Sequence, residues 1–92
     1  MKLLFIGDIV GGPGRDIVVR AVRGLKRAES LDLVIANAEN AAGGSGLTPA
    51  LYNDLVAAGV DAITLGDHVY RRKQIGKTLE AEANIVRPAN LP

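Results

Sequence analysis

Short apolar runs alternate with segments of helical periodicity along this chain, and this alternation restricts its fold more than any other feature. The runs at residues 2–7, 31–37, 61–66 and 84–86 are predicted to be short strands. Helices are predicted after the first three runs, over residues 18–25, over 49–59 and, more weakly, over 72–82. Strands that alternate with helices in this way form parallel pairs joined by right-handed crossovers. The sequence therefore predicts an α/β fold built from parallel βαβ units.

The ends of the predicted helices have signals of their own. A turn-rich stretch at residues 8–14 precedes the first helix. Thr48 is the expected N-cap of the second helix, with Pro49 at its first helical position. That helix is expected to end near Gly59, because glycine accepts the left-handed conformation that closes many helices.

Length, composition and charge limit the class of protein. The 92 residues correspond to one domain at most, so we expect residues 1–92 to form a single domain. Hydrophobic residues make up 48% of the chain but aromatic residues only 3%, which suits a sheet covered by helices. A formal net charge of +1 gives no general attraction to nucleic acid or to an anionic membrane, and neither is predicted as a partner. Cysteine is absent, which excludes disulfides and thiolate metal sites and is compatible with the cytoplasm, the predicted compartment.

The first predicted helix carries a basic face. Its cationic side chains are those of Arg15, Arg20, Arg23, Lys26 and Arg27. A solvated surface is the ordinary interpretation of such a face, and a weak attraction to RNA or nucleotides is the alternative.

Polar side chains that can carry chemistry follow the first three predicted strands. Asp8 follows the first strand, Glu39 and Asn40 follow the second, and Asp67 and His68 follow the third. Because parallel strands point the same way, these groups are expected to converge on the carboxyl edge of the sheet, where open α/β folds bind ligands. Carboxylates a few ångströms apart repel one another unless a proton, a basic group or a metal intervenes. Oxygen and imidazole ligands suit manganese, iron, zinc or magnesium better than a soft metal.

Each of these residues also has an ordinary structural role available. Asp8 could cap the helix that follows it, which is a common role of aspartate. Glu39 and Asn40 could belong to a polar loop, and a lone histidine such as His68 more often lies on a surface or in a satisfied core position. Their recurrence at the same end of three successive strands favours one shared functional site.

Four sequence blocks carry a family resemblance. The blocks "FIGDIVGGPGR", "ANAENAAGGSGLT", "TLGDHVY" and "NIVRPANLP" lie within residues 4–92. In order and spacing they resemble the bacterial YmdB-like metallophosphoesterases of the calcineurin-like superfamily. The resemblance implies one half of a four-layer αββα sandwich, with residues 1–92 forming the N-terminal portion of a longer enzyme.

The resemblance also implies a function and a set of site residues. It implies a hydrolase of phosphodiesters, including cyclic nucleotides such as 2',3'-cyclic AMP, with two divalent metal ions (Fe, Mn, Mg or Zn). Asp8 resembles a ligand of the first metal and Glu39 the carboxylate that bridges both. Asn40 and Asp67 resemble ligands of the second metal, and His68 the general acid. Histidine suits that role because its unperturbed pKa is about 6.5, so it can protonate a leaving oxygen near neutral pH.

Two features depart from the family pattern. Asp67 stands where the family block Gly-Asn-His has asparagine, and its charge should tighten cation binding and favour protonated His68. The later histidine blocks that complete both metal shells are absent, and one sheet face would be exposed in a monomer. We therefore expect the N-terminal portion of a longer protein, or a homo-oligomer that covers the exposed face. The alternative function is a non-catalytic α/β binding or assembly module.

Overall fold

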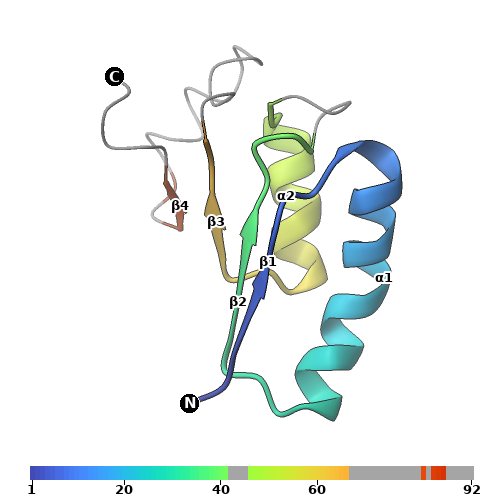
Figure 1. The fold of residues 1–92 in the computed structure, drawn as a ribbon, viewed down its shortest axis with the longest axis vertical. Coiled ribbons are helices and arrows are strands. Elements are labelled where there is room, and N and C mark those ends of the chain that lie inside the picture. Colours follow the sequence, from blue (N-terminus) through green and yellow to red (C-terminus); the bar gives the residue numbers. More distant parts are fainter. Residues whose placement is uncertain (42–45, 67–81, 83, 87–92) are drawn as a thin grey trace.

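A parallel sheet with helices on one side forms the part of the protein that the computed structural model describes, residues 1–41, 46–66, 82 and 84–86. The strands are β1 (Leu3–Ile6), β2 (Leu33–Asn37), β3 (Ala62–Thr64) and β4 (Ile85–Val86), hydrogen-bonded in that order. The helices are α1 (Gly11–Ala28) and α2 (Pro49–Ala58), and both lie on the same side of the sheet (Figure 1). The predicted α/β fold is confirmed; nearly all of the helix expected over residues 72–82 lies outside the described residues.

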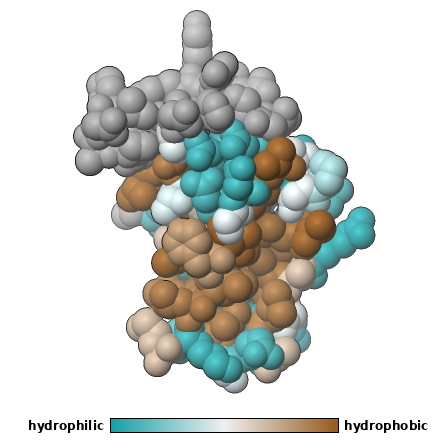
Figure 2. All heavy atoms as spheres, in the orientation of Figure 1, coloured by the Kyte–Doolittle hydropathy of each residue, from teal (hydrophilic) through white to brown (hydrophobic). Residues whose placement is uncertain are grey.

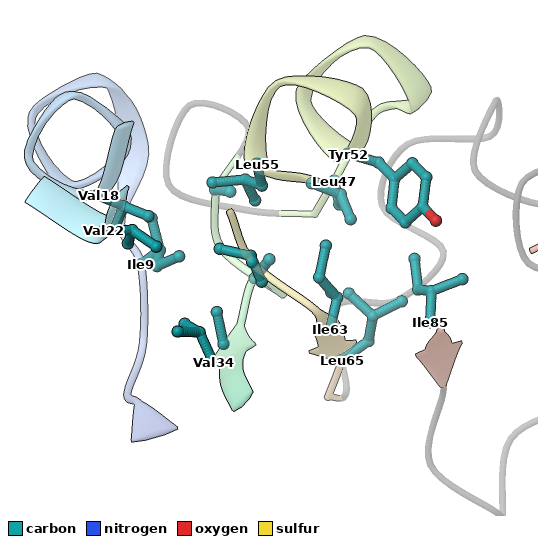
Figure 3. Packing of buried hydrophobic residues seen from close by; sticks show 14 residues of the cluster. Ile9, Val18, Val22, Val34, Leu47, Tyr52, Leu55, Ile63, Leu65 and Ile85 are labelled. Atoms are coloured by element: carbon teal, nitrogen blue, oxygen red, sulfur yellow. The ribbon is translucent and has the colours of Figure 1, made fainter. Parts of the chain in front are cut away.

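The core lies between the sheet and the two helices. Successive side chains of a strand point to opposite faces, so every second residue of β2 and β3 is buried. Figure 3 shows these side chains meeting those of α1 and α2 across a single apolar layer. The layer includes Val34, Ala36, Ile63 and Ile85 from the strands, Val18 and Val22 from α1, and Tyr52 and Leu55 from α2. Full burial of one such aliphatic side chain stabilises the fold by about 1.5–3 kcal/mol.

The opposite face of the sheet is apolar and is not covered by the described residues. Leu3 and Phe5 of β1 are 53% and 61% exposed. The strand register places Leu33 beside Leu3 and Ile35 beside Phe5 on this face. Figure 2 shows a broad hydrophobic area there. We call these residues, with Asn37, Ala62, Thr64 and Val86, the open sheet face; none of them is charged.

The first helix begins earlier than the sequence predicts. Residues 8–14 were expected to form a turn, but α1 starts at Gly11. Pro13 is tolerated because the first helical turn has N–H groups without intrahelical partners. The Gly11 N–H donates instead to the Asn40 carbonyl oxygen at 3.1 Å. The early start shortens the β1–α1 connection to residues 7–10 and ties it to the segment after β2.

The second helix has the predicted ends. The Thr48 hydroxyl accepts a hydrogen bond from the Leu51 N–H at 3.3 Å, and Pro49 is the first helical residue. Gly59 closes the helix with φ of 116°, a conformation that favours glycine. A Cβ atom on Gly59 would also lie 3.2 Å from the Val22 side chain of α1. Gly59 therefore both ends α2 and lets the two helices approach.

Asp61 joins the start of β3 to β2 and α1, and its charge should make stability depend on pH. Its Oδ2 accepts from the Val34 N–H at 2.8 Å and lies 2.9 Å from Lys26 Nζ. Burial raises the pKa of Asp61, but the hydrogen bonds from Lys26 and Val34 lower that pKa by more, so it lies below its usual value. A carboxyl with a lowered pKa stabilises the fold above its unfolded pKa and loses that contribution as pH falls through the folded one.

We expect Asp61→Asn to reduce the free energy of unfolding by about 1 kcal/mol at neutral pH, because the pair is partly exposed. The difference from the unsubstituted protein should shrink as pH falls below the ordinary aspartate pKa of about 3.9 and disappear once Asp61 itself is protonated. Urea denaturation at several pH values measures it. The exposed Asp54→Asn is the control and should show little effect at either pH. An equal loss for Asp61→Asn at neutral and acid pH would contradict the charge interaction.

Candidate functional site

The segments that follow the strands stay side by side at the carboxyl edge of the sheet. Backbone hydrogen bonds continue the sheet ladder past the strand ends, from Ile9 N to Asn37 O, from Ala38 N to Thr64 O and from Leu65 N to Val86 O, at 3.0–3.1 Å. The register pairs Asn37 with Thr64, so Glu39 and Gly66 each stand two residues past a paired position. The first residues of the connections are therefore hydrogen-bonded in line with the sheet, and their side chains share one edge.

Buried apolar residues flank the polar ones at this edge. Ile9, directly after Asp8, is 3% exposed, and Ala38 and Ala41, on either side of Glu39 and Asn40, are fully buried. Asp8 itself is exposed, whereas Glu39 and Asn40 are half-buried. Burial of the apolar neighbours fixes the backbone, so the positions of the polar side chains are set by the core.

Asp8 and Asn40 are in direct contact although 32 residues separate them along the chain. Asn40 Nδ2 donates to Asp8 Oδ1 at 2.8 Å. A carboxylate only accepts, so the amide must present its nitrogen to Asp8, and this bond does not use the amide oxygen, the atom that binds hard cations. The N-cap of α1 is Val10, without a side-chain cap. The alternative role of Asp8 as a helix cap is therefore wrong.

The Glu39 carboxylate reaches from the end of β2 to the end of β3. It lies against Gly66, where a Cβ atom would be closer than 3.0 Å to both of its oxygens. The Glu39 N–H donates to Asn37 Oδ1 at 3.4 Å, and Asn37 Nδ2 donates to Thr64 Oγ1 at 3.3 Å. The Glu39 carbonyl oxygen accepts from the Gly46 N–H. Glu39 is thus held through both its backbone and its side-chain surroundings.

The described residues supply only part of the predicted site. They bring together Asp8, Asn40 and Glu39 at the ends of β1 and β2, while Asp67 and His68 lie outside them. Residues 1–41, 46–66, 82 and 84–86 contain no group of three or more His, Cys, Asp or Glu side chains that could hold a metal. Two carboxylates and an amide fit hard divalent cations by their chemistry, but they form an incomplete shell.

Two contributions at this edge were not anticipated from the sequence. Asn37 lies in the sequence block "ANAENAAGGSGLT", but its bond to Thr64 depends on the pairing of β2 with β3. Its bond to Glu39 lies at the same edge. Gly66 ends the third apolar run, and its contact with Glu39 likewise requires the register. The sequence feature that could have indicated this contact is the glycine directly before Asp67, at the predicted end of a strand.

Part of the basic face of α1 has a structural use. Arg23 Nη2 donates to the Ala57 carbonyl oxygen of α2, and Lys26 pairs with Asp61. A hollow of about 570 Å³ lies between α1 and α2, lined by residues including Arg15, Arg23 and Asp54 but by none of the edge residues described above. The hollow is therefore separate from the candidate site.

Among the described residues, no helix has the length and apolar character needed to cross a membrane.

The fold and this edge define an α/β protein whose oxygen-bearing side chains gather at the carboxyl ends of parallel strands. Residues 4–92 match the model of the family described as YmdB-like protein, and the chain belongs to that family. It is 48% identical over 92 residues to a 2',3'-cyclic-nucleotide 2'-phosphodiesterase of Bacillus subtilis (strain 168), covering all of this chain and 35% of that protein.

Solved structures show the same relationship. A crystal structure of a protein from Thermus thermophilus has a TM-score of 0.91 and 43% identity, covering 100% of this chain and 35% of its own. A phosphatase from Mycoplasma pneumoniae has a TM-score of 0.92 and 39% identity, covering 100% of this chain and 33% of its own. The chain thus spans about a third of the length of the curated relative and solved structures that it matches.

Proposed function

We propose that the natural polypeptide carrying this chain is a metal-dependent phosphoesterase that hydrolyses phosphodiesters, cyclic nucleotides such as 2',3'-cyclic AMP among them. In this proposal residues 1–92 are the N-terminal portion of a longer cytoplasmic enzyme and form one side of a binuclear centre. The observation that carries the proposal is the Asp8–Asn40 contact at the sheet edge where the Glu39 carboxylate also lies, in a member of this family. The name of the Bacillus subtilis relative supports the substrate class.

The residues fit the proposed group by their donor chemistry. Asp8 would hold one divalent ion, Glu39 would bind both, and Asn40 and Asp67 would hold the other. Their oxygens are the donors that hard cations prefer. When bound, the two ions (Fe, Mn, Mg or Zn) would supply charge neutralisation and Lewis acidity to the phosphodiester.

His68 would complete the chemistry as the general acid. Hydrolysis breaks the bond between phosphorus and the leaving ester oxygen, and that oxygen departs as an alkoxide unless a proton reaches it. In this proposal the imidazolium of His68 donates that proton as the bond breaks.

Removal of metal tests the proposal on the natural polypeptide. We expect hydrolysis of bis-p-nitrophenyl phosphate and of 2',3'-cyclic AMP in the presence of Mn²⁺. Treatment with EDTA should reduce both rates by a factor of about 10³ or more, because the ions carry charge neutralisation, and Mn²⁺ should restore them. Product release is followed by absorbance for the first substrate and by chromatography for the second. Rates unchanged by EDTA would contradict a metal-dependent reaction.

The open sheet face favours a second candidate. A largely apolar face without charged residues is typical of a surface that another protein layer covers. A non-catalytic binding or assembly module, including a homo-oligomer formed through this face, would use that surface and would need no metal. Absence of bound Mn²⁺ in a folded natural polypeptide would support this candidate over the phosphoesterase.

A further inference from the structure

We propose that Gly66 is a positioning residue, because its lack of a side chain leaves the space that the Glu39 carboxylate occupies. The expected effect of Gly66 on metal binding rests on the proposed function. The contact between Gly66 and Glu39 rests on the geometry at the ends of β2 and β3 and is independent of metal. Gly66 would thus set where a proposed bridging ligand is presented without itself touching the ion.

The need for glycine at this position is one of space. A Cβ atom on Gly66 would be closer than 3.0 Å to the carboxyl carbon and both oxygens of Glu39. The backbone of Gly66 is not in the left-handed region, which among the described glycines is occupied by Gly11, Gly46 and Gly59. An alanine could therefore adopt the Gly66 backbone conformation, and among the described residues the three atoms nearest to its methyl group would all belong to the Glu39 carboxylate.

The backbone around Glu39 has little freedom to move aside. Ala38 is fully buried, and its N–H donates to the Thr64 carbonyl oxygen at 3.0 Å. The Glu39 N–H and carbonyl oxygen are both hydrogen-bonded. The carboxylate is the far end of a side chain with several rotatable bonds. A methyl group at position 66 should therefore displace the carboxylate and leave the fold in place.

Gly7 provides a matched control at the same edge. It ends the β1 run directly before Asp8, as Gly66 directly precedes Asp67. A Cβ atom on Gly7 would meet nothing within 4 Å, and its φ is likewise outside the left-handed region. A general effect of replacing an edge glycine should appear at Gly7 as well as at Gly66.

The first measurement is Mn²⁺ affinity of the natural polypeptide by isothermal titration calorimetry. Gly66→Ala is expected to weaken Mn²⁺ binding about tenfold or more, the loss typical of a displaced ligand support, while Gly7→Ala leaves it unchanged. Unaltered affinity in Gly66→Ala, in a protein that binds Mn²⁺, would overturn the positioning role. Equal losses in both variants would overturn it too.

The second measurement separates this proposal from the proposed function. Melting temperatures are compared in EDTA with and without Glu39→Ala. Without the Glu39 carboxylate, Gly66→Ala should raise Tm by about 2 °C, because alanine reduces the freedom of the unfolded chain. With Glu39 present, the displaced carboxylate should cancel or reverse that gain. An equal Tm shift in both backgrounds would overturn the Gly66–Glu39 contact even if metal binds normally.

Each outcome bears on one claim. A natural polypeptide that binds no Mn²⁺ would contradict the proposed function, whereas the Tm comparison in EDTA would still decide on Gly66. If Glu39→Ala does not fold, Glu39→Asp replaces it, since it withdraws the carboxylate by one methylene. In that background Gly66→Ala should give a higher Tm change than it gives with Glu39, and an equal Tm change in both backgrounds would overturn the contact.

Discussion

Replacing Glu39 by alanine is expected to lower phosphodiester turnover and Mn²⁺ affinity of the natural polypeptide about a hundredfold or more. Loss of residues that merely support metal ligands typically costs 10–100-fold, so loss of a carboxylate shared by two ions should cost at least about that much. The structure gives the physical reason for a local effect. The Glu39 side chain reaches from the end of β2 to the end of β3, and the buried residues beside it are untouched by the change.

Two variants separate the charge of Glu39 from its shape. Glu39→Gln keeps the length of the side chain against Gly66 but removes the charge, so Mn²⁺ affinity should fall nearly as far as in Glu39→Ala. Glu29→Ala is the control, because Glu29 is an exposed residue at the far end of α1 whose ion pair with Lys2 spans 3.9 Å. Calorimetry and steady-state kinetics measure both properties. Full activity in Glu39→Ala with normal metal content would contradict the site.

His68→Ala is expected to reduce turnover of 2',3'-cyclic AMP about 10²–10⁴-fold at saturating Mn²⁺ while leaving Mn²⁺ affinity unchanged, the loss typical of a missing general acid. His68 lies outside the described residues, so this prediction rests on the role that the family resemblance implies for it.

The leaving group tests the role assigned to His68. The alkoxide released from a cyclic nucleotide needs a proton, whereas p-nitrophenolate is a weak base that departs without one. His68→Ala should therefore slow bis-p-nitrophenyl phosphate hydrolysis less than about tenfold. Initial rates with both substrates at saturating Mn²⁺ provide the comparison. Equal losses for the two substrates, or weakened Mn²⁺ binding, would mean that His68 acts on the metal or the fold.

Local signals predicted the parts of the fold that depend on local physics. The N-cap Thr48, Pro49 and the left-handed Gly59 define α2 in the sequence as they do in the structure. The start of α1 was missed because its glycine and proline residues indicate a turn. The N–H of Gly11 at the start of this helix donates to the carbonyl oxygen of Asn40, a partner distant in sequence.

In the candidate site, too, the sequence predicted some features and missed those that depend on contacts between distant residues. The rhythm of strands and helices was enough to place Asp8, Glu39 and Asn40 at one edge. It could not give the Asp8–Asn40 hydrogen bond or the contact between Glu39 and Gly66, because both depend on how neighbouring strands are aligned. A shift of one residue in that register would turn the side chains to the opposite face. The roles of Asp67 and His68 stay predictions.

The most direct test is a divalent-metal titration of the natural polypeptide beside its Asp8→Ala and Glu39→Ala variants, with metal content measured independently by mass spectrometry. The account predicts about two Mn²⁺ ions per subunit in the unsubstituted protein, as a two-metal site requires, and loss of metal in each variant without unfolding. A folded protein that binds no metal, or variants that bind as much metal as the unsubstituted protein, would contradict it.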